Sequence, residues 1–102
     1  MTEITIKGKY DIEIKGHSPD KRVCSGISTL TAALEGWLLN NVSDYTYHEG
    51  DGYVRIKAPK EAKTAVEMFA IGILRIEKSF PDTVRVTYIS NRDDQQDRLR
   101  KA

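Results

Sequence analysis

Residues 16–28, GHSPDKRVCSGIS, separate two patterns: a β pattern ends where this segment begins, and a helical pattern starts within it. On its N-terminal side, polar and apolar residues alternate over residues 2–7 and 9–15, with Gly8 between the two runs. Alternation with a period of two is typical of half-buried strands. We therefore predict a β-hairpin with one solvated face.

On the C-terminal side, apolar residues recur at helical spacing from Cys24 to about Asn40. Side chains three and four positions apart share one face of a helix, so the spacing predicts an amphipathic helix. Trp37 completes this stripe and is expected in the core. The whole stripe consists of Ile27, Leu30, Leu34, Trp37 and Leu38.

The rest of the chain adds two strands, a helix and a final strand. Residues 44–48 and 53–57 are the expected strands, on either side of a Glu-Gly-Asp-Gly segment that is typical of a hairpin turn. A second helix is predicted from Pro59 to about Phe80. Residues 83–90 alternate again and form the last predicted strand.

The resulting order, ββαββαβ, indicates an α+β fold. Hairpins imply antiparallel pairs, and two amphipathic helices need one face of a sheet to cover. We therefore expect a two-layer sandwich, in which an antiparallel sheet carries both helices on one face. Residues 1–90 are expected to form one domain, and residues 91–102 a charged C-terminal tail with a frayed end.

Composition excludes some classes of function. The 102 residues include 16 Lys and Arg against 15 Asp and Glu, a net charge of +1. This balance disfavours direct nucleic-acid binding, which needs a marked basic excess or patch. No apolar run resembles a signal peptide or a membrane span. The single cysteine is expected as a free thiol in the cytoplasm.

Cys24 and His17 are the candidate catalytic residues. A thiol at a helix N-terminus, close to Lys21 and Arg22, is favoured as a thiolate, which is the reactive form. Free backbone N–H groups there are expected to receive an oxyanion during acyl transfer. A seven-residue separation allows the His17 imidazole to fold back onto the thiol as a general base. The alternative is a structural cysteine beside an exposed loop histidine.

Three small residues after the nucleophile are candidates for binding or orienting a substrate. Ser28 lies one helical turn after Cys24, on the same face. Ser25 is also explained as a capping residue, and Gly26 either admits a substrate to the helix backbone or lets the helix pack closely. No cofactor is expected, and no metal site, because the His, Cys and acidic residues lack metal-binding spacing.

The residues Gly16-His17 followed by Val23-Cys24-Ser25-Gly26-Ile27-Ser28 resemble the signature of the ribosomal-processing cysteine protease family. That family has a Gly-His at a strand end and a Cys-small-small-aliphatic-Ser run that opens the first helix. The resemblance implies a homodimeric protease that removes an N-terminal extension from a large-subunit ribosomal protein, or processes a phage structural protein, and cuts after an aromatic residue. It assigns His17 as the base and Cys24 as the nucleophile.

The loop between these two residues differs from the family pattern. It is shorter than usual and contains Pro19, and Lys21 stands where family members tend to have an acidic residue. Two hypotheses from different classes therefore follow from the sequence. One is a cysteine endopeptidase with a His17–Cys24 dyad, and the other is a non-catalytic peptide-binding module of ribosome or capsid assembly.

Overall fold

The structure is a computed structural model that describes residues 1–8 and 10–89. The predicted order ββαββαβ is confirmed, with one short 3₁₀ helix added before the second α-helix. The expected tail, residues 91–102, lies outside the described residues. In chain order the elements are β1 (Thr2–Lys7), β2 (Asp11–Lys15), α1 (Lys21–Asn41), β3 (Thr46–Gly50), β4 (Tyr53–Lys57), η1 (Lys60–Ala62), α2 (Lys63–Ser79) and β5 (Val84–Ile89).

The sheet has the strand order β3-β4-β2-β1-β5, with β3 and β5 at its edges. Three of the four neighbouring pairs are antiparallel, as predicted. The expectation of an entirely antiparallel sheet is wrong, because β5 pairs with β1 in parallel, from Thr2↔Val84 to Lys7↔Ile89. A hairpin turn fixes only the relative direction of the two consecutive strands that it joins. Strand β5 is not joined to β1 by a hairpin, because α2 precedes it in the chain, so the turns do not determine the direction of this pair.

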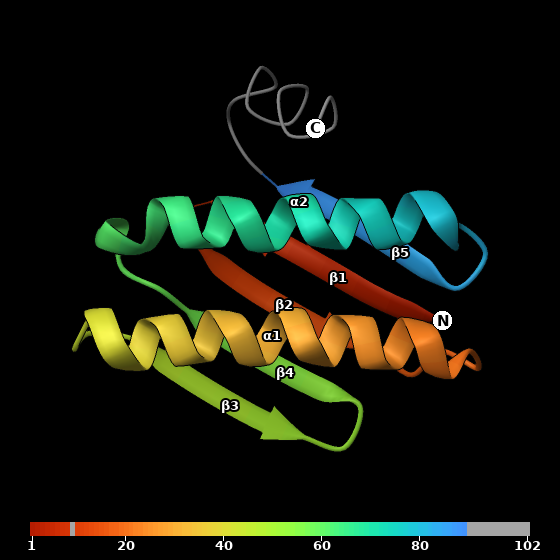
Figure 1. The fold of residues 1–102 in the computed structure, drawn as a ribbon, viewed down its shortest axis with the longest axis horizontal. Coiled ribbons are helices and arrows are strands. Elements are labelled where there is room, and N and C mark those ends of the chain that lie inside the picture. Colours follow the sequence, from red (N-terminus) through yellow and green to blue (C-terminus); the bar gives the residue numbers. More distant parts are fainter. Residues whose placement is uncertain (9, 90–102) are drawn as a thin grey trace.

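Both helices cover the same face of the sheet, as the sequence predicts. Figure 1 shows α1 and α2 side by side in front of the strands, with β3 and β5 at opposite edges. The other face carries polar residues, among them Arg55, which donates two hydrogen bonds of 2.8 Å to Asp11. The core lies between the layers and contains, among others, Ile4, Ile12, Val23, Leu38, Ile56, Phe69, Ile73 and Val84.

Helix α1 begins three residues earlier than predicted, at Lys21 rather than Cys24. Asp20 caps it, because its Oδ1 accepts a 2.9 Å hydrogen bond from the Arg22 N–H. An aspartate at this position satisfies a backbone donor that the helix itself leaves unpaired. As a result, Cys24 is the fourth residue of the helix.

Trp37 is not a core residue, contrary to the prediction. Its side chain is 36% exposed, whereas Leu34 and Leu38 are buried. Trp37 lies on the side of α1 that faces α2, where it lines a groove of about 340 Å³ together with Met68 and Phe69. The two leucines take the positions nearest the sheet, so the indole remains at the surface between the helices. No helix of the described residues is long and apolar enough to cross a membrane.

Candidate active site

A cleft of about 450 Å³ brings together residues that are distant in the sequence. One side is the N-terminal half of α1, including Cys24 and Ser28, and the other is the β3–β4 hairpin. His17, from the loop after β2, lines the same cleft. The structure therefore places His17, Cys24 and Ser28 around one space.

Cys24 lies on the cleft-lining side of α1 and is partly buried. Its thiol donates a hydrogen bond to the Ser18 carbonyl oxygen, with Sγ and O 3.4 Å apart. Ser18 is buried in the loop that connects His17 to the helix. The short loop thus holds the thiol through its own backbone.

The backbone N–H groups of residues 22–24, at the start of α1, already have hydrogen-bond partners. The N–H groups of Val23 and Cys24 donate to the Asp20 carbonyl oxygen at 3.1 and 3.2 Å. The Arg22 N–H donates to the Asp20 side chain. In this structure these groups, which were expected to receive an oxyanion, make the first hydrogen bonds of the helix, because the helix starts earlier than predicted.

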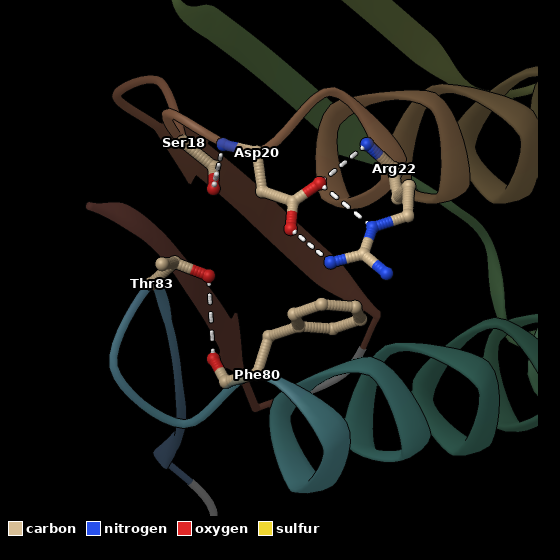
Figure 2. A network of polar contacts seen from close by, with 5 residues as sticks. All are labelled: Ser18, Asp20, Arg22, Phe80 and Thr83. Atoms are coloured by element: carbon tan, nitrogen blue, oxygen red, sulfur yellow. Dashed lines mark hydrogen bonds and ion pairs between the residues drawn. The ribbon is translucent and has the colours of Figure 1, made fainter.

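The charge of Arg22 is also committed elsewhere. Its guanidinium donates hydrogen bonds of 3.1 and 2.7 Å to the Asp20 carboxylate. Figure 2 shows this pair, with the guanidinium above the Phe80 ring. The guanidinium carbon lies 5.1 Å from the ring centroid. This hydrogen-bonded pairing lowers the pKa of the Asp20 carboxyl and raises that of Arg22. The pair is neutral overall, so the predicted cationic surroundings of Cys24 reduce to Lys21.

His17 is accessible at the mouth of the cleft, with 67% of its side chain exposed. Its Nε2 lies 3.3 Å from Oδ1 of Asp51, in the turn between β3 and β4. No hydrogen bond joins His17 to Cys24 within residues 1–8 and 10–89. In this state the imidazole and the thiol each have another partner.

Two glycines allow His17 to take this position. Gly16 has φ +92, and a Cβ there would collide with the Met1 carbonyl oxygen. Its N–H donates a 2.9 Å hydrogen bond to the Gly52 carbonyl, which ties the end of β2 to the hairpin turn. Gly52 has φ +65, and a Cβ there would lie 2.7 Å from Nε2 of His17. Backbone in this region favours glycine.

Ser25 and Gly26 do not line the cleft, in contrast to Ser28. Ser25 is exposed, and its carbonyl oxygen accepts a hydrogen bond from Thr29 at 2.8 Å. Gly26 faces the second helix, where an added Cβ would lie 3.1 Å from Cδ1 of Ile76. The absence of a side chain at residue 26 therefore serves the packing of α1 on α2.

Thr2 belongs to the cleft but was not a candidate from the sequence. Its side chain is 2% exposed, and its hydroxyl has no hydrogen-bond partner among the described residues. A buried hydroxyl without a partner loses its hydration and gains nothing in return. The alternation of β1 predicted which face of the sheet the Thr2 side chain lies on. It gave no indication that Thr2 lines the same cleft as His17.

The hairpin contributes two further residues, Tyr47 and Glu49. Strand register places Glu49 opposite Val54, which is itself paired with Ile14, and Tyr47 opposite Ile56, so both lie on the sheet face that the helices cover. The Tyr47 hydroxyl donates a 2.7 Å hydrogen bond to Oε2 of Glu49. Both residues line the cleft.

Metal-binding geometry does not occur in the described part of the chain. No group of three His, Cys, Asp or Glu side chains lies close enough together there to hold a metal ion.

The fold can be compared with solved structures. Two structures of the essential ribosomal processing protease Prp from Staphylococcus aureus are similar to this chain. The one with a covalently linked product peptide has a TM-score of 0.78 at 18% identity, and the one with a substrate peptide 0.77 at 17%. Both comparisons cover 86% of this chain and 99% of Prp. A Streptococcus mutans protein gives 0.72 at 20% identity, over 89% of this chain and 96% of that one.

These likenesses establish that the chain has the fold of Prp over most of its length. No protein-family model matches the chain, and no curated protein matches it in sequence. The resemblance inferred from residues 16–28 is therefore supported at the level of the fold.

Proposed function

We propose that this protein is a cysteine endopeptidase in which Cys24 is the nucleophile and His17 the general base. The observation that carries the proposal is that both residues line one cleft, although they come from a loop and a helix. The likeness to Prp supports it, since Prp structures hold peptides.

The proposed reaction needs only these two groups and water. His17 takes the thiol proton, and Sγ of Cys24 attacks the scissile carbonyl carbon. The tetrahedral intermediate collapses when His17 gives that proton to the leaving amine, which breaks the C–N bond and leaves a thioester. Water, deprotonated by His17, then hydrolyses the thioester, and the proton returns to the thiol.

Asp51 supports this role of the imidazole. A proton on Nε2 is held by the Asp51 carboxylate 3.3 Å away, which leaves Nδ1 as the nitrogen that accepts the thiol proton. Substrate binding has to replace the bond from Cys24 to the Ser18 carbonyl with one to His17. We therefore propose that the peptide draws the two groups together.

The proposed substrate is the N-terminal extension of a large-subunit ribosomal protein, or a phage structural protein, cut after an aromatic residue. This follows from the sequence resemblance. From the same resemblance we propose that the protein works in the cytoplasm as a homodimer. Light scattering at about tens of micromolar tests the dimer, and a monomer there would contradict it.

The decisive experiment incubates the protein with N-terminally extended ribosomal proteins and phage structural proteins and locates the cut by mass spectrometry. We expect Cys24→Ala to abolish cleavage, and His17→Ala to reduce it by about 10²-fold or more, with little change in stability. His48→Ala is the matched control, because His48 is exposed on β3 and does not line the cleft. Full activity of His17→Ala would eliminate the dyad.

A non-catalytic peptide-binding module is the second candidate. It is favoured by the neutral hydrogen bond of Cys24 to Ser18 and by the occupied N–H groups of α1. Alkylation with iodoacetamide at about pH 6 separates the two, because only a thiolate reacts quickly there. Slow alkylation together with peptide binding would support the module.

A further inference from the structure

The cleft extends from His17 and Cys24 to the edge strand β3, where the lining residues change from apolar to polar. Paired residues on β2, β4 and β3 form rows that run across the sheet. In one row the apolar Ile14 and Val54 are followed by Glu49 on β3, and in the next row Ile12 and Ile56 are followed by Tyr47. Helix α1 lies over the inner strands, and β3 lies at the edge (Figure 1). At this end of the cleft, the polar residues Tyr47 and Glu49 therefore stand where the inner strands have apolar core residues.

The charge at this end is negative. Glu49 is exposed and lines the cleft, and it forms no ion pair in the part of the chain that the structure describes. None of the described cleft-lining residues is a lysine or an arginine. Burial, the hydrogen bond to Glu49 and the nearby charges of Glu49 and Glu35 raise the pKa of Tyr47. Its hydroxyl thus stays protonated and keeps donating to Glu49.

We propose that Tyr47 and Glu49 form a subsite for a lysine or arginine side chain of the peptide that the cleft binds. The Tyr47 hydrogen bond fixes Oε2 of Glu49, and the carboxylate then meets the cation through its other oxygen. An ammonium or guanidinium group makes a charge-assisted hydrogen bond to such a carboxylate. An acidic side chain at the same peptide position is repelled by Glu49. The subsite therefore both favours cationic side chains and disfavours acidic ones.

This inference rests on the proposed function for the peptide nature of the ligand, but it concerns binding rather than catalysis. It is therefore tested with the Cys24→Ala protein, which binds without cutting. The probes are pools of acetylated dodecapeptides, each with one fixed position that carries Lys, Arg, norleucine or Glu. The immobilised protein captures peptides at low salt, and mass spectrometry quantifies those retained.

We expect one fixed position at which Lys and Arg are enriched over Glu by about tenfold, which corresponds to about 1.4 kcal/mol. Adding Glu49→Gln should remove this enrichment, and adding Glu49→Lys should reverse it in favour of Glu. Tyr47→Phe keeps the ring but not the hydrogen bond, and should reduce the enrichment partly. Glu61→Gln is the matched control, because Glu61 is exposed on η1 and outside the cleft.

Unchanged enrichment with Glu49→Gln, equal retention of Lys and Glu pools, or no retention of any pool would each overturn the subsite. Cationic enrichment in a protein that cleaves none of the candidate substrates would leave the subsite standing and reject the endopeptidase. The two proposals therefore fail on different measurements.

Discussion

The imidazole of His17 lies against Gly52, and the space it uses is the space a Cβ would fill. A Cβ built at residue 52 lies 2.7 Å from Nε2 and 3.2 Å from Cδ2 of His17. The neighbouring Asp51 carboxylate reaches the same nitrogen. The β3–β4 turn thus sets the position of the proposed base. His17 itself follows β2, so a hairpin later in the chain positions a residue that comes earlier in it.

Gly52→Ala should displace the imidazole and reduce peptide cleavage by about 10²-fold, because a shift of about 1 Å in a catalytic group costs that much. A steady-state assay measures this, with the extended ribosomal or phage protein that the incubation experiment shows to be cut. Gly8→Ala is the matched control, since Gly8 also has a positive φ, +48, but open space around its Cβ position. Equal losses of activity in the two variants would show that backbone strain alone is responsible.

Thr2→Val should leave the free energy of unfolding unchanged or higher, because the buried hydroxyl has no partner among the described residues. If that hydroxyl donates to bound peptide, the same variant should lower kcat/KM by about threefold to tenfold, the worth of one hydrogen bond. Urea denaturation and peptide cleavage measure the two effects. A strongly destabilised Thr2→Val would mean that the hydroxyl has a structural partner.

The Asp11–Arg55 pair should make stability depend on pH in the acid range. The hydrogen bonds from Arg55 lower the pKa of Asp11 in the folded protein. Between this value and the ordinary aspartate pKa, the unfolded chain binds more protons, so the free energy of unfolding rises with pH. The stabilisation is complete above about pH 4 and is lost as the pH falls through the lowered pKa.

Asp11→Asn should therefore be less stable than the natural chain near neutral pH, and should lose less further stability below about pH 4. Urea denaturation at a series of pH values measures this. Asp82→Asn is the control, because Asp82 is exposed and forms no ion pair among residues 1–8 and 10–89. A natural chain and Asp11→Asn with parallel pH profiles would contradict the assignment.

Leu38→Ala should destabilise the protein by about 2–5 kcal/mol, as expected for a fully buried leucine. Trp37→Ala should cost less than Leu38→Ala, because the indole is 36% exposed and lines an open groove. Thermal unfolding of both variants gives the comparison. A larger loss for Trp37→Ala would indicate that another surface covers the indole.

Local pattern was enough to place the helices and strands. Period-two alternation identified β1 and β2, and the helical stripe identified α1, because each pattern reports which side of an element is buried. The pattern did not show which apolar residues on the buried side are fully buried and which stay partly exposed. Leu34 and Leu38 are buried while Trp37 is exposed, since the packing of α1 against α2 decides which apolar residue lies nearest the sheet.

Strand alternation, helical spacing and loop length are local properties, so the amino-acid sequence alone was enough to place His17 just after a strand and Cys24 in the first turn of a helix. The surroundings of these two residues depend instead on how the whole chain packs. The parallel pairing of β5, the Asp20 cap that occupies the N–H groups of α1, and the β3–β4 turn beside His17 all depend on contacts between segments far apart in the chain. Periodicity reports which face an element buries, but the neighbour it meets there is fixed by the packing of the whole chain.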